Sequence, residues 1–205
     1  PPRSTLFPYT TLFRSVGADT VNMGYVELFE NGVEWQPGIA KSTYNGSMAA
    51  WDVSGILVDR KGERVVNERG SGIDIVTQQA AQEDGTLFLL MDQATFDHFR
   101  ENIGGTGISQ QMLDNWLENN GKDSPIFAHG ETLEEVAGII GIDKDALQKT
   151  IETYNQYVDS GVDADFGRSA DYMTAKIGDG PYYLVEQKPR YATTLGGLLI
   201  NTELQ

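Results

Sequence analysis

The chain is poor in the side chains that ligate metals or attack substrates. Its 205 residues include no cysteine and two histidines, His98 and His129, which lie far apart in the sequence. Without cysteine there are no disulfides, cysteine-ligated zinc sites, iron–sulfur clusters or thiol nucleophiles in this chain. Two separated histidines do not give the ligand spacing of a zinc site. We therefore predict that the chain holds no metal.

Glycine-rich phosphate-binding loops are the next source of chemistry, and they are absent from the sequence. No GxGxxG follows an expected strand, and GxxxxGK[ST], HExxH and GxSxG are also missing. The nearest glycine-rich piece is GGTG at 104–107, which lacks both the spacing and the preceding strand. It is typical of a loop between two helices, so the chain has no dinucleotide fingerprint of its own.

The charge balance excludes two classes of partner. Thirty acidic and 15 basic residues give a formal charge of −15 and a pI of about 4.4. Such a surface repels nucleic-acid phosphates and anionic lipid. In addition, no stretch approaches the ~18 apolar residues of a membrane span. We expect neither a nucleic-acid partner nor a membrane span.

Helices that would position a site show clear start signals. Asp92 and Asp143 are expected caps, and Thr132 begins a capping box, T-L-E-E. The helix after Asp143 is long and stops at Gly161. Two further helices are expected at 73–82 and 108–119, and 16–23 has the pattern of a helix tail.

Strands are expected between these helices. The apolar run 86–91 predicts a buried strand, and 55–59 with 64–67 predict a hairpin around a glycine-containing turn. Other strands are predicted at 25–29, 182–188 and 195–201, whereas 31–51, rich in Gly, Asn and Ser, has the composition of a loop. Because helices and strands mix without regular βαβ alternation, the predicted fold class is α+β.

The N-terminal segment differs from the rest of the chain. Residues 5–15, TLFPYTTLFRS, resemble the translation of a sequencing adapter, so we interpret 1–15 as non-native. The native sequence would then begin near Val16. The end at LLINTELQ lacks a closing element, and we expect the chain to be a fragment.

Four segments, in order, resemble the FAD-dependent fumarate reductase and succinate dehydrogenase flavoprotein family. The likeness is to the bacterial branch of flavocytochrome c fumarate reductases and urocanate reductase-like proteins. The segments are VGADTVNMGYVE at 16–27, GILVDRKGERVVNE at 55–68, ETLEEVAGIIGIDKDALQKTIETYNQYVDSGVDADFGR at 131–168 and TTLGGLLIN at 193–201.

This resemblance implies a domain organisation and a cofactor. It assigns 29–185 to the capping, or substrate-clamp, domain and 16–28 and 186–205 to short pieces of the FAD-binding domain. FAD is implied as the cofactor, bound mostly by parts that this chain does not contain. Gly196 and Gly197 match the family's glycine pair, where a missing Cβ lets the backbone approach a flat ring.

The family holds a dicarboxylate with histidines and a threonine, and this chain departs from that pattern. Phe29 and Thr193 stand where the family has histidines, and Gly72 stands where it has the proton-donating arginine. Ser47 and Met48 align with the family's Thr-Glu. Because a dicarboxylate needs charged donors, we expect a less charged substrate than fumarate.

One cation remains beside the motif. Trp51 replaces the family's proton-relay arginine, which leaves Arg69 as the candidate proton donor. An arginine needs a relay to solvent to act as an acid. The alternative is that Arg69 forms a loop ion pair. Asp165 and Arg168 are predicted to form a structural i,i+3 pair.

The resemblance implies a partial FAD-dependent oxidoreductase. Its capping segment would close a flavin site for hydride transfer to or from a carbon–carbon bond of a small organic substrate, with an electron donor that the sequence does not name. Two alternatives remain open, a non-catalytic binding module that reuses the capping fold and an inactive paralogue.

Overall fold

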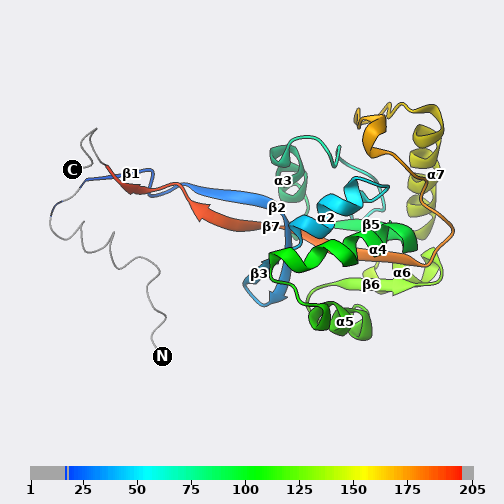
Figure 1. Ribbon diagram of the computed structural model, residues 1–205, viewed down its shortest axis with the longest axis horizontal. Helices are drawn as coiled ribbons and strands as arrows, with labels where there is room; N and C mark the ends of the chain where they lie inside the picture. Colours follow the sequence, from blue (N-terminus) through cyan, green and yellow to red (C-terminus); the bar gives the residue numbers. More distant parts are fainter. Residues whose placement is uncertain (1–16, 18, 200–205) are drawn as a thin grey trace. The chain divides into compact units, whose positions relative to one another are not determined.

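The computed structural model describes Gly17 and residues 19–199 (Figure 1). The adapter-like segment 1–15 therefore lies entirely outside the described residues, and so do the last two residues of the strand predicted at 195–201. Contacts divide the chain into a large unit, Phe29–Arg190, and a small unit on either side of it in sequence, through Leu28 and from Tyr191 onward.

A sheet with strand order β3-β2-β7-β5-β4 forms the centre of the large unit, and β6 also pairs with β7. The strands are β2 (Val26–Gln36), β3 (Ile39–Ser42), β4 (Ile56–Val58), β5 (Leu87–Asp92), β6 (Phe127–Gly130) and β7 (Tyr182–Thr194). All six residues of β5 are buried, and β5 pairs antiparallel with β4 and β7. The predicted buried strand is confirmed, as is the mixed helix-and-strand fold.

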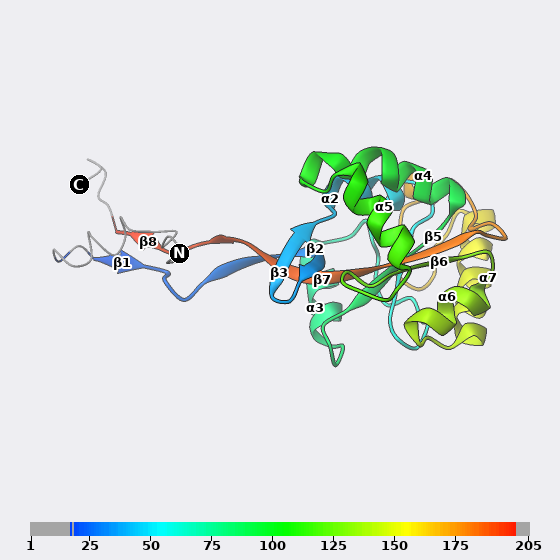
Figure 2. The ribbon, with the colours of Figure 1, turned by 90° about the horizontal axis from the view of Figure 1, so that it is seen from below.

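Helices cover both faces of this sheet (Figure 2). They are α2 (Tyr44–Trp51), α3 (Gly72–Ala80), α4 (Gln93–Asn102), α5 (Gln110–Asn119), α6 (Leu133–Ile140) and α7 (Lys144–Ser160), with short 3-10 turns η1 (Ile103–Thr106) and η2 (Ala170–Tyr172). Leu89 of β5 packs with α2, α4 and α5, whereas its neighbour Leu90 packs with α6 and α7. Alternation along the strand therefore builds two cores, one on each face.

The predicted helix starts are confirmed. Asp92 accepts a hydrogen bond from Thr95 N, and Asp143 accepts from Asp145 N and Ala146 N. Thr132 and Glu135 complete the capping box. These caps satisfy backbone N–H groups that have no partner within the helix. Gly161 ends α7 in the left-handed region, at φ 69°.

The prediction of a loop at 31–51 is wrong, because this segment forms most of β2, then β3 and α2. Its small residues allow close packing. A Cβ on Gly32 would lie 2.7 Å from Lys188 O of the neighbouring strand, and one on Gly46 would lie 3.0 Å from the Phe99 ring. Composition alone indicated a loop, but these glycines mark places where backbones and rings touch.

Two helical glycines test this packing. We expect Gly46→Ala to destabilise the chain by about 1–3 kcal/mol, because the new methyl would press on Phe99. Gly138→Ala in α6 is the matched control, since nothing lies within 4 Å of the added methyl, and it is expected to stabilise by about 0.5–1 kcal/mol. Urea unfolding measures both. Equal effects of the two substitutions would contradict the packing role of Gly46.

The small unit contains one antiparallel pair, β1 (Thr20–Val21) with β8 (Gly197–Leu198). The helix tail predicted at 16–23 is therefore wrong for its described part, because pairing with β8 supplies the backbone partners that a helix would have supplied. The strand predicted at 195–201 is reduced to β8 among the described residues. None of the described helices is both long and apolar enough to cross a membrane.

Candidate substrate pocket

A pocket of about 260 Å³ lies in the large unit, where α2, the start of α3 and β2 meet the loop before α3. Three of the predicted site residues line it, namely Met48, Arg69 and Gly72. The other lining residues are Glu30, Tyr44, Trp51, Glu68, Gly70 and Ile75. The pocket therefore combines an apolar wall with the cation Arg69 and two carboxylates, of which Glu30 takes part in none of the ion pairs among the described residues.

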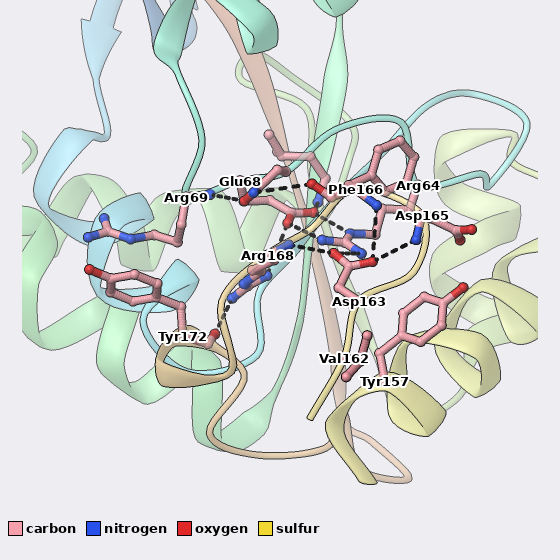
Figure 3. A network of polar contacts seen from close by, with 12 residues as sticks. Arg64, Glu68, Arg69, Tyr157, Val162, Asp163, Asp165, Phe166, Arg168 and Tyr172 are labelled. Atoms are coloured by element: carbon pink, nitrogen blue, oxygen red, sulfur yellow. Dashed lines mark hydrogen bonds and ion pairs between the residues drawn. The ribbon is translucent and has the colours of Figure 1, made fainter. Parts of the chain in front are cut away.

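Arg69 is held in place on the pocket wall. Its Nε lies 3.2 Å from Asp52 Oδ1, and its guanidinium lies 4.3 Å from the centre of the Tyr172 ring. Figure 3 shows Arg69 beside Tyr172. A third contact, 3.4 Å long, joins Nη1 to the sulfur of Met48. The Arg69 side chain is 18% exposed and that of Asp52 is 52% exposed, so the cation is sheltered while its partner reaches solvent.

Gly72 makes room for a second polar group, Glu30. A Cβ at Gly72 would lie 3.0 Å from Glu30 Oε2. Glu30 is 9% exposed and lines the same pocket. Sequence reasoning missed it, because Glu30 sits at the edge of the segment interpreted as a loop. The position after Phe29 was the only available signal.

The remaining predicted pocket residues lie elsewhere. Ser47 is fully buried and does not line the pocket, and its hydroxyl donates a hydrogen bond to Gln187 Oε1 at 3.1 Å. The Phe29 ring lies 5.0 Å from the guanidinium of Arg190 and does not line the pocket. Thr193 is exposed and belongs to the small unit. The structure therefore brings Met48, Arg69 and Gly72 together, without Ser47, Phe29 or Thr193.

A buried ionic network lies next to the pocket (Figure 3). Arg64 pairs with Glu68 at 2.8 Å and with Asp163 at 2.9 Å, and Arg168 pairs with Glu68 at 3.1 Å. Their side chains are at most 5% exposed. Arg168 thus pairs with Glu68 and not with Asp165, so the predicted i,i+3 pair is wrong. The network joins the two sequence segments 55–68 and 131–168.

Arg168 also fixes the residues around Arg69. Its guanidinium donates to the backbone oxygens of Trp51 and of Tyr172, the latter at 2.7 Å, and to Gly55 O at 2.8 Å. Trp51 forms part of the pocket wall, and Tyr172 lies against Arg69. The buried network therefore positions the pocket as well as the core.

The electrostatics of the network keep it ionised. Burial would raise the pKa of Glu68, but the guanidinium groups of Arg64 and Arg168 outweigh burial and hold this pKa below its ordinary value. Burial would likewise lower the pKa of Arg64, but Glu68 and Asp163 raise it instead. Tyr154 lies 5.4 Å from Arg64 and 5.5 Å from Arg168, and burial raises its pKa to about 12.

Comparison with known proteins identifies the family. Residues 29–205 match the family described as FAD binding domain. This chain belongs to that family. It is 31% identical over 190 residues to the urocanate reductase of Eggerthella lenta, an alignment that covers 93% of this chain and 29% of that protein. The predicted family and its cofactor FAD are thus confirmed, and this relative is a reductase, in line with the predicted oxidoreductase type.

Two solved structures extend the comparison of this flavoprotein chain. The open conformation of a flavocytochrome c3 fumarate reductase matches with a TM-score of 0.69 at 22% identity, over 94% of this chain and 30% of that one. The solution structure of a fumarate reductase flavoprotein subunit from Lactobacillus plantarum matches with a TM-score of 0.61 at 33% identity, over 75% of this chain and 94% of that one. The chain therefore spans under a third of the length of the urocanate reductase, and nearly all of the Lactobacillus chain.

The family's cofactor raises the question of which residues fit a flavin. A Cβ on Gly196 would lie 2.6 Å from Met23 Cα, so this glycine is needed for packing within the small unit. Among the residues that the structure describes, no atom lies within 4 Å of a Cβ added to Gly197. Gly197 therefore has the room that the close approach of a flat ring needs, and the flavin contacts at Gly196 and Gly197 stay predictions.

Proposed function

We propose that residues 29–190 of this flavoprotein form a capping domain that covers a flavin site. In the complete protein, the covered site would transfer hydride to or from a carbon–carbon bond of a small organic acid. Residues 16–28 and those after 190 are then the flanking pieces of the FAD-binding part, close to the boundaries 29 and 185 expected from the sequence. Because the family match spans 29–205 as an FAD binding domain, the capping role remains our proposal.

The chain path supports a cap inserted into a larger protein. The large unit begins within β2 and ends within β7, and these two strands are neighbours in the sheet. The unit is therefore connected through one pair of adjacent strands. Its sequence also lacks the GxGxxG loop with which a dinucleotide-binding fold holds pyrophosphate. The match to almost the whole Lactobacillus chain supports a unit that folds alone.

The pocket supplies groups for this chemistry. Bound FAD supplies the hydride acceptor or donor. Arg69 would bind the acid group of the substrate or give a proton to its carbon. Asp52, 3.2 Å from Arg69 and half exposed, would return that proton from solvent. Trp51 and Ile75 are buried apolar residues of the wall that would exclude water from the reacting bond.

One observation carries the proposal: Met48 and Gly72, which align with substrate-site positions of the family, and Arg69, the cation beside the motif, meet in a single pocket of about 260 Å³. Urocanate and fumarate, named by the relatives, are unsaturated acids of a size that such a pocket can hold. Fumarate itself fits less well, because Glu30 lies in the same pocket and repels a second carboxylate.

The test uses two proteins. The 205-residue chain, titrated with FAD, is expected to show no tight stoichiometric binding. The protein translated from the complete reading frame is expected to hold FAD and to oxidise a reduced dye when an unsaturated monocarboxylate is added. A dye replaces the unknown electron donor. Tight FAD binding by the 205-residue chain alone would contradict the cap. A complete protein that holds FAD and reduces no acceptor would favour the inactive paralogue.

A further inference from the structure

Glu30 is an acidic side chain without a counter-ion in the pocket. It is 9% exposed, and within the described part of the chain it takes part in none of the salt bridges. Its one side-chain hydrogen bond comes from Asn31 Nδ2 to Oε1 at 3.3 Å. Carboxylates this buried are normally paired, because burial without a partner is unfavourable. Glu30 is therefore expected to bind a hydrogen-bond donor from a ligand.

The surroundings explain how Glu30 is tolerated without using up its second oxygen. Oε2 faces Gly72, the first residue of α3, where the positive end of the helix dipole favours negative charge. Burial lowers the pKa of Arg190 and the charge of Glu30 opposes this, while Arg190 is held by stacking over Phe29 and a 3.5 Å contact to Asn31. Both effects act at a distance, so Oε2 keeps its capacity to accept a hydrogen bond from the pocket.

Arg69 sits in the same pocket and is already paired with Asp52. The pocket thus presents a guanidinium and a separate carboxylate, with apolar surface from Trp51 and Ile75. This pattern is complementary to a ligand with an acid group at one end and a hydrogen-bond donor at the other. A second acid group would meet Glu30 and be repelled.

We infer that Glu30 is the specificity-determining residue of this pocket, and that it selects unsaturated acids whose far end carries an N–H or O–H donor. The inference rests on the proposed function, because it takes the pocket to be the substrate site. The inference adds the chemical class of the substrate and names the residue that recognises the donor group of that substrate.

Matched probes test the inference in the complete, oxidised flavoprotein, by calorimetric binding without turnover. 3-(2-Furyl)acrylate replaces the imidazole of urocanate by a furan, which has no N–H donor, and cinnamate lacks the O–H of 4-hydroxycinnamate. We expect the donor-bearing member of at least one pair to bind about 10- to 100-fold more tightly, as for a hydrogen bond to a charged group. In Glu30→Ala this ratio should fall to near one.

Two further variants exclude simpler explanations. Glu30→Gln keeps the size of the side chain and should bind fumarate about tenfold more tightly than the native protein, because the repulsion is gone. Glu101→Gln, on the exposed face of α4, should change no ratio. Thermal unfolding of each variant reports whether it is folded.

The outcomes separate the two proposals. If the native protein binds both members of each pair equally, or if its preference survives in Glu30→Ala, the inference about Glu30 is wrong. If the same protein still holds FAD and reduces an acceptor, the proposed function stands without it. Failure to hold FAD overturns both.

Discussion

Replacing Arg69 with glutamine is expected to lower kcat/KM of the complete flavoprotein about 10²- to 10⁴-fold for an unsaturated monocarboxylate, the range of a lost proton donor. The physical reason is position. Arg69 is the cation that the pocket walls present to a ligand, and three contacts, to Asp52, Met48 and Tyr172, hold it there. Glutamine is polar but carries no charge, so the contacts to Asp52, Met48 and Tyr172 cannot restore the lost cation. Dye oxidation under steady-state conditions measures the loss.

Two companion variants separate the roles of Arg69. Asp52→Asn keeps the Arg69 charge but removes its route to solvent, so kcat should fall while KM changes little. If Arg69 only binds the acid group, Asp52→Asn should instead leave kcat unchanged. Arg100→Gln breaks an exposed pair with Asp114 of similar length, 3.1 Å, outside the pocket, and should leave activity as it is. An Arg69→Gln enzyme of native activity would remove Arg69 from the site.

Local signals in the sequence predicted helices and strands well where a single local interaction determines the element. Caps such as Asp92 and Thr132 act within four residues, and the apolar run at β5 needs burial whatever surrounds it. The prediction of a loop at 31–51 failed because two glycines of this segment make close contacts with Lys188 and Phe99, which lie more than 50 residues away in sequence. Composition reports backbone freedom and does not report such contacts.

The residues of the pocket were predictable only in part, because some of them are recognised along the sequence and others only in the fold. Met48 and Gly72 were found through their alignment with family motifs, and Arg69 through its place beside one of them, because motifs record positions along the chain. Glu30 could not be found that way, because its place in the pocket depends on a contact in the fold, where Gly72 leaves space for its side chain. The network of Glu68 and Arg168 was also missed. These residues lie 100 positions apart, and i,i+3 spacing drew attention to Asp165 instead.

Glu68 is expected to give the largest stability effect in the chain. Glu68→Gln should lower the free energy of unfolding by about 3–5 kcal/mol, the range found when one partner of a buried ion pair is removed. The glutamine keeps the shape but leaves Arg168, whose side chain is fully buried, without its carboxylate. Asp84→Asn is the control. It breaks the half-exposed pair with Arg60 and should change the free energy of unfolding by less than about 1 kcal/mol.

Tryptophan fluorescence during urea unfolding is the suitable measurement. Trp35, Trp51 and Trp116 all lie in the large unit, so the signal reports on the unit that contains Glu68. A Glu68→Gln chain that unfolds at the native urea concentration would show that the network contributes nothing net to stability. The matched charge loss in Asp84→Asn removes the effect of net charge from the comparison.

The pH dependence gives Glu68 a signature that packing alone would not. Burial opposes ionisation, but Arg64 and Arg168 hold the folded pKa of Glu68 below the unfolded value of about 4.3. The unfolded chain therefore binds the proton more readily, and stability falls as the pH drops. The contribution of Glu68 is complete above about pH 4.3 and is lost as the pH falls through the folded pKa. The gap in stability between the native and Glu68→Gln chains should thus begin to narrow as the pH falls below about 4.3. Glu186, whose pKa burial raises, changes both chains alike and cancels. A gap that stayed constant down to pH 3 would assign the loss to packing and not to charge.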